Sequence, residues 1–135
     1  MKKSKLTIIL YIISVLLLSL TFYHFATQPT GLLKKYAKTI NYYKKKWPRD
    51  MKIEYVGIAN SVEEAIEQAE IALLNYNYIS EFDLVQIRPL KVEYDEKNKI
   101  WHVYNRSEDF SYSGEIHILF RQKDGKVLAI WVGVG

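Results

Sequence analysis

The feature that most constrains this chain is an uncharged, largely apolar run over residues 6–26. As a helix rising 1.5 Å per residue, these 21 residues would extend roughly 31 Å, close to the ~30 Å hydrocarbon thickness of a bilayer. Lysines at positions 2, 3 and 5 precede the run, and Phe22 and Tyr23 stand near its end, where aromatic rings suit the headgroup region. The run therefore predicts a transmembrane anchor, with its cytoplasmic tip, over residues 1–28.

A cleaved signal peptide would share the basic start, but its apolar core spans only about 7–15 residues and ends in small residues at the cleavage site. Here the run is longer, and His24 stands where such a small residue belongs. We therefore expect an uncleaved, single-pass anchor in the cell membrane. The short lysine-tipped N-terminus favours an extracytoplasmic C-terminal domain, although the lysines that follow the run favour the opposite orientation.

Charge divides the chain into two unequal halves. Residues 1–52 contain eleven Lys or Arg and one acid, whereas residues 53–135 contain eight Lys or Arg and fourteen acids. Because the positive half adjoins the anchor, we expect anionic lipid headgroups as its partner and no nucleic acid. The absence of cysteine excludes disulfides and thiolate metal sites. We expect a basic juxtamembrane stem over residues 29–52 and an α+β binding domain over residues 53–135.

The stem itself shows helical periodicity. Its apolar positions recur at helical spacing, with lysines between them: Leu32, Leu33, Tyr36, Ala37, Ile40, Tyr43 and Trp47. Such a helix either lies on the bilayer surface or forms the first helix of the domain. The sequence leaves both interpretations open.

The acidic half predicts one capped helix followed by strands. Ser61 is a typical N-cap, and Glu64 three residues later completes a capping box. An apolar stripe follows: Val62, Ile66, Ala69, Leu73 and Tyr76. Strand-like runs cover residues 51–58, 84–87, 90–94, 100–104, 115–122 and 127–134. Together these predict an α+β roll with the helix on one face of an antiparallel sheet.

The loop Lys123-Asp124-Gly125 sets the register of the last hairpin. A three-residue loop with Gly125 in the left-handed conformation places the large aliphatic residues on one face. It pairs Phe120 with Leu128, Ile118 with Ile130, and Ile116 with Val132. It also places His117 opposite Trp131 on the other, outward face.

No catalytic, cofactor or metal motif stands out. We expect His102 and His117 to be half-exposed strand residues, and no carboxylate spacing around them suggests a metal site. Carboxylates gather in two expected turns, at Glu93 and Asp95 and at Glu108 and Asp109. We expect these four acids to contact a protein partner. The chain is therefore expected to be a binding module without enzymatic activity.

Residues 61–131 resemble the nuclear transport factor 2 fold immunity proteins, small bacterial domains thought to neutralise toxins. The matching positions are Ala65, Ile66 and Ala69 on the helix, Pro89, Trp101 and Val103 at the strands, Gly114, and Asp124 with Gly125 in the last turn. This resemblance implies a nuclear transport factor 2-like or cystatin-like roll, and an immunity protein that occludes a toxin. The extracytoplasmic PepSY domains resemble the same half of the chain and imply a regulator of a neighbouring protein. An enzyme of the nuclear transport factor 2-like superfamily would require a deep polar pocket that holds His102 or His117 beside a carboxylate.

Overall fold

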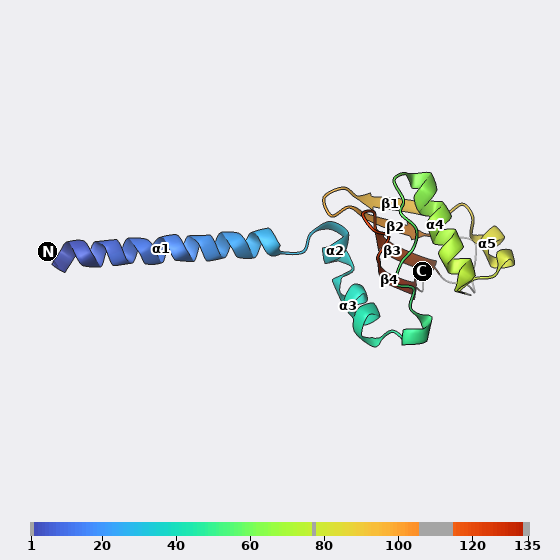
Figure 1. Cartoon of the computed structure of the whole chain (residues 1–135), viewed down its shortest axis with the longest axis horizontal. Helices are drawn as coiled ribbons and strands as arrows, with labels where there is room; N and C mark the ends of the chain where they lie inside the picture. The colour runs from blue at the N-terminus through green and yellow to red at the C-terminus, as the bar shows by residue number, and fades with distance from the viewer. Residues whose placement is uncertain (1, 77, 106–114, 134–135) are drawn as a thin grey trace. The chain divides into compact units, whose positions relative to one another are not determined.

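The computed structural model describes residues 2–76, 78–105 and 115–133, and it divides the chain into two units, residues 1–30 and 31–135 (Figure 1). The first unit contains helix α1 (Lys2–Thr27). The stretch Ser4–Tyr23 within it has a mean hydropathy of 2.3, so α1 is long and apolar enough to cross a membrane. The long apolar helix expected from the sequence is confirmed.

The second unit is an α+β domain. Its helices are α2 (Gly31–Lys35), α3 (Ala37–Lys46), a short 3-10 helix (Arg49–Met51), α4 (Val62–Asn75) and α5 (Glu81–Ile87). Its strands are β1 (Lys91–Asp95), β2 (Ile100–Tyr104), β3 (Glu115–Arg121) and β4 (Val127–Gly133). The described strands form an antiparallel sheet in the order β1-β2-β3-β4. The predicted α+β class and antiparallel sheet are confirmed.

Side chains alternate between the two faces of this sheet, and helices cover both. On one face, Trp101 donates its indole N–H to the carbonyl of Ala59, next to α4, which contacts β1 and β2. On the other face, the Tyr36 ring, between α2 and α3, contacts the rings of His102 and Trp131. The face that we expected to point outward is therefore covered.

The cover comes from the segment that we expected to be a separate stem. Leu32 and Tyr43 are only 4% and 5% exposed and belong to the hydrophobic core of the domain. The compact unit consequently begins at residue 31 and not at residue 53. Of the two interpretations of the periodic stretch, packing into the domain is correct, because its apolar stripe is buried against the sheet.

Two of the predicted strands are wrong. Residues 84–87 belong to helix α5, which begins with a reciprocal cap: the Ser80 hydroxyl accepts from the Asp83 N–H, and the Asp83 carboxylate accepts from the Ser80 N–H, both at 3.1 Å. That cap satisfies N–H groups that a helix start leaves unpaired. Residues 51–58 do not form the second predicted strand: among the described residues, their strand pairing is a single isolated bridge between Tyr55 and Lys126.

Helix α4 begins at the predicted cap, where the Ser61 hydroxyl accepts from the Glu64 N–H at 3.1 Å. The Glu64 carboxylate reaches the N–H of Asn60, at 2.7 Å, so the reciprocal half of the box is shifted by one residue. The buried stripe is also rotated from the predicted one, with Val62 and Tyr76 about half exposed. The buried residues are Ala65, Ala69, Ala72 and Leu73. Their small side chains allow α4 to lie close to the sheet.

The last hairpin largely follows the predicted register. Gly125 has a φ of 74°, and the pairs Ile118–Ile130, Ile116–Val132 and His117–Trp131 form as expected. Phe120 instead pairs with Val127, because the register shifts by one residue between Leu119 and Phe120. A bulge at this point accommodates Leu128, the extra residue of β4 between the two pairs. Gly114, expected at the start of β3, lies outside the described residues.

We expect Gly125→Val to lower the free energy of unfolding by roughly 1–3 kcal/mol, because the left-handed conformation disfavours a β-branched residue. A Cβ at this position would also collide with the carbonyl oxygen of Val56. Urea unfolding of the variant measures the loss. Gly125→Asn separates the two causes, since asparagine tolerates the left-handed conformation but keeps the Cβ. Wild-type stability for both variants would contradict this description of the turn.

Candidate functional site

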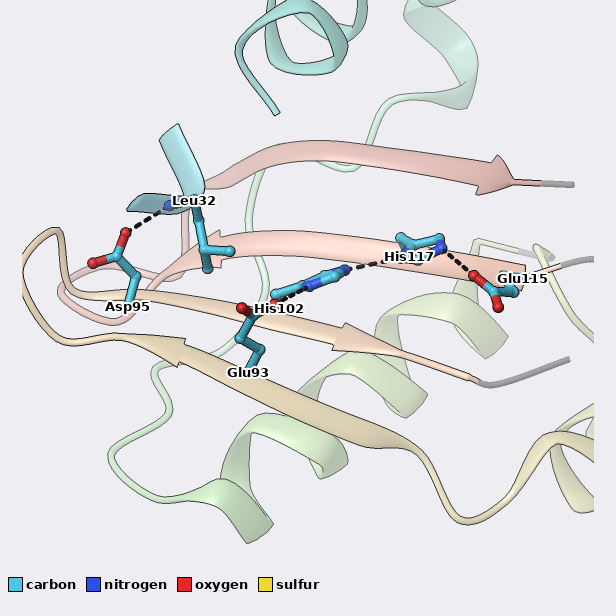
Figure 2. Close-up of polar contacts among 6 residues, drawn as sticks. All are labelled: Leu32, Glu93, Asp95, His102, Glu115 and His117. Atoms are coloured by element: carbon cyan, nitrogen blue, oxygen red, sulfur yellow. Dashed lines mark hydrogen bonds and ion pairs between the residues drawn. The ribbon is translucent and has the colours of Figure 1, made fainter. Parts of the chain in front are cut away.

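Two histidines on the central strands form a direct contact. His102 Nε2 on β2 lies 2.8 Å from His117 Nδ1 on β3. The outer nitrogens are also occupied: His102 Nδ1 lies 3.2 Å from Glu93 Oε2, and His117 Nε2 lies 3.1 Å from Glu115 Oε2 (Figure 2). We call this row of four residues, Glu93, His102, His117 and Glu115, the histidine chain.

The register of the sheet brings these residues together. Glu93 pairs directly with His102 across β1 and β2. His117 pairs with Tyr104, two residues beyond His102, so the two imidazoles are diagonal neighbours on one face. Glu115 precedes His117 by two residues and therefore shares that face. The sequence alone could not show this alignment, because the alignment depends on how β1, β2 and β3 pair.

The histidines are buried, contrary to our expectation of half-exposed side chains. Only 2% of His102 and 8% of His117 is exposed. Tyr104 stacks on His102 with ring centroids 4.6 Å apart, and Trp131 stacks on His117 at the same distance. The Tyr36 ring adds an edge contact to His102 at 5.1 Å. The expectation failed because the covering segment was assigned to the stem.

Hydrogen-bond chemistry limits the number of protons that the histidine chain can hold. Each of its three contacts needs one hydrogen, whereas two neutral imidazoles supply only two. With both carboxylates ionised, the neutral pair leaves one terminal contact without a proton, and one added proton completes all three. A second added proton would turn two N–H groups toward each other between His102 and His117, at a separation of 2.8 Å.

Burial lowers the pKa of His102, and the hydrogen bond that its ring donates to Glu93 only partly offsets that effect. Burial likewise lowers the pKa of His117 against the opposing influence of Glu115. The positive charge of Lys35 adds to the lowering at both rings. The folded domain therefore binds protons on this pair at a lower pH than the unfolded chain does.

The predicted partner-binding acids have different surroundings. Glu93 belongs to the histidine chain, and its side chain is 46% exposed. Asp95 accepts a hydrogen bond from the backbone N–H of Leu32 at 2.9 Å (Figure 2). It accepts another from the side chain of Asn98 at 2.8 Å. Burial raises the pKa of Asp95, but these hydrogen bonds outweigh it and hold the pKa below its usual value. Asp95 thus fixes the start of α2 to the sheet.

Glu108 and Asp109 lie outside the described residues. Among the residues of the immunity-protein pattern, Ala65, Ala69, Trp101 and Val103 are buried in the core, and Gly125 forms the last turn with Asp124. The Asp124 carboxylate pairs with Arg121. Ile66 is partly buried against the core, and Pro89 is exposed before β1.

A cavity of about 420 Å³ opens beside the Glu93 end of the chain. Its lining consists of Gly31, Leu32, Lys35, Glu93, Tyr94, Asp95 and Glu96. Of the histidine chain, therefore, Glu93 lines this cavity, whereas neither His102 nor His117 does so. A second cavity, of about 450 Å³, lies between α3, residues 52–55 and β4, and Lys44, Lys52 and Lys126 contribute to its lining. Across the described part of the chain, no three His, Asp or Glu side chains are grouped as metal ligands.

Helix α5 presents a different kind of surface. Phe82 and Val85 are 67% and 65% exposed, one helical turn apart, and the exposed acids Glu81 and Asp83 flank Phe82. Arg88 ties this region to α4 through both oxygens of Glu70, at 3.0 and 2.8 Å. Sequence reasoning missed the surface because it treated these residues as a loop and a strand. The capping pair Ser80 and Asp83 was the signal that could have found it.

Comparison of the chain with protein-family models, with curated proteins and with solved structures gave no match.

Proposed function

We propose that this protein is a membrane-tethered, non-catalytic binding module that occludes a protein partner. In the form that the sequence resemblance suggests, it is an immunity protein that neutralises a bacterial toxin outside the cytoplasm. The observation that carries the proposal is the exposed pair Phe82 and Val85 on a helix that also exposes carboxylates.

The composition of α5 supports a protein partner of basic character. Large apolar side chains at a surface lose water when a partner covers them, and aromatic residues supply much of the binding energy in interfaces. Glu81 and Asp83 place negative charge beside this apolar centre. On α4, Glu63 and Glu67 are further exposed carboxylates. Complementary charge would speed the encounter with a basic partner and select against acidic ones.

The tether rests on α1 and on the basic residues that follow it. We infer that α1 crosses the membrane once and that the domain is extracytoplasmic. Lysines at positions 44, 45 and 46 at the end of α3 are exposed. Each basic residue near an anionic bilayer surface contributes about 1 kcal/mol of attraction. Lipid headgroups are therefore the second partner in this proposal.

The histidine chain is the observation that favours the alternative of an acid–base enzyme. Imidazoles beside carboxylates can move protons. However, Tyr36, Tyr104 and Trp131 cover these imidazoles, so a substrate could reach only the two carboxylates, Glu93 and Glu115. Binding is for that reason the function that we propose.

The test uses the full chain in its native membrane, with a photo-crosslinking amino acid at position 82 or, as the matched control, at exposed Tyr55. We expect position 82 alone to crosslink one protein, and the chain to remain in the membrane after carbonate washing. The purified partner should lose activity when bound. The E67K/E81K variant, which leaves the Ser80–Asp83 cap of α5 intact, should then associate more slowly at low salt, with the loss shrinking as exposed charges are screened beyond ~8 Å at physiological salt.

The control for that variant is E54K/E96K, which makes the same change in net charge on residues away from α5. If both variants slow association equally, the effect reflects overall charge and the proposed surface is wrong. Release of the chain from the membrane by carbonate would contradict the tether.

A further inference from the structure

We propose that the histidine chain is a pH-sensitive contact that holds α2 and α3 on the sheet at neutral pH and releases them when the paired imidazoles take up a second proton. The helices α2 and α3 belong to the domain itself, so their release is a property separate from binding by α5.

The central contact permits one bridging hydrogen. His102 Nε2 and His117 Nδ1 are 2.8 Å apart, a separation at which one nitrogen must donate and the other accept. With one added proton, the charge is shared along a complete row of hydrogen bonds that ends at two carboxylates. With two added protons, both nitrogens donate, and two like charges face each other in a buried site. The pair must then separate.

Separation of the rings would disturb the helical cover directly. Tyr36 contacts His102 at 5.1 Å and Trp131 at 4.8 Å, and Trp131 in turn stacks on His117. Tyr36 lies between α2 and α3 and is hydrogen-bonded to both, through Leu32 and Ile40. A movement of either imidazole therefore reaches the cover through Tyr36, whose ring contacts the site and whose backbone is hydrogen-bonded to both helices.

The charged and titratable groups around the pair come from every element packed against it. Lys35 and Tyr36 face it from the helical cover, Glu93 from β1, Tyr104 from β2 and Glu115 from β3; the contact from β4 is the uncharged Trp131. Two carboxylates can balance one imidazolium fully. A second imidazolium adds repulsion from the first and from Lys35.

The direction of the pH dependence follows from proton binding. Burial lowers the pKa of both histidines, so the unfolded chain binds more protons near pH 6.5 than the folded domain does. Stability must then rise with pH through this range. The contribution of the pair is fully present above about pH 6.5 and is lost as the pH falls toward the lower folded values. Asp95 stays ionised over that range because its pKa is lowered, so protonation of Asp95 is not what releases α2.

Hydrogen exchange of the full chain in detergent micelles tests the proposal at pH 7.5, 6.5, 5.5 and 4.5, with rates corrected for the intrinsic effect of pH. We expect amides of residues 32–46 to lose protection by tenfold or more on acidification, the factor that corresponds to one pKa unit. Amides of α4 should keep their protection over the same range. H117Q should remove the selective loss, because glutamine cannot become charged.

A second variant keeps the test decisive if H117Q does not fold. E93Q removes a group that raises the pKa of His102, and it should shift the loss of protection to lower pH. E96Q is its matched control, since Glu96 is exposed nearby and is not one of the main groups that shift the pKa of either histidine. The proposal is overturned if residues 32–46 and α4 lose protection together, or if E93Q and E96Q exchange like wild type at every pH.

Discussion

Replacing Tyr43 with phenylalanine is expected to lower the free energy of unfolding by about 2–5 kcal/mol, since it strands two buried backbone groups. The Tyr43 hydroxyl donates to the carbonyl of Ile53 and accepts from the N–H of the same residue, both at 2.9 Å. Ile53 is fully buried and Tyr43 is 5% exposed, so water does not replace the lost partner. These bonds join α3 to the chain segment that leads to the rest of the domain.

Tyr42→Phe is the matched control, because Tyr42 is the preceding residue of the same helix but is 53% exposed. We expect that variant to remain within about 0.5 kcal/mol of wild type, as surface substitutions usually do. Chemical denaturation followed by circular dichroism measures both variants. Equal stabilities for the two would show that α3 is not fixed to the domain through Tyr43.

Local patterns in the sequence predicted the elements whose structure is decided locally. The Ser61 cap, the left-handed Gly125 and the runs that became β1 to β4 each depend on neighbouring residues, and each was found. Alternation along β3 and β4 was enough to place His117 opposite Trp131. In these cases propensity, pattern and turn chemistry agree.

Of the two main errors, one overlooked a local signal and the other arose where distant packing decides the outcome. The run Leu84–Ile87 reads as a short strand, but its helical state depends on the cap that Ser80 forms with Asp83. The apolar stripe beginning at Leu32 fitted a membrane surface as well as it fitted a sheet, because both bury one side of a helix. Nothing local in the sequence distinguishes the two.

The candidate site depends on that distinction. The sequence supplied both histidines and Glu93, but their contact required the register of three strands, and their burial required the helical cover from outside the expected domain. A histidine on an uncovered sheet face would titrate near its ordinary pKa. The same histidine beneath Tyr36 becomes part of a buried pair, so the boundary of the domain determines what the site can do.

The boundary can be measured with two fragments, residues 31–135 and residues 53–135. Removing residues 31–52 takes away the apolar contacts of Leu32, Tyr36, Ile40 and Tyr43, roughly 5–10 kcal/mol of burial, which rivals the whole stability of a small domain. We predict a cooperative urea transition for residues 31–135 and none for residues 53–135. A cooperative transition of equal midpoint for the shorter fragment would contradict the account, because the histidine face would then be stable without its cover.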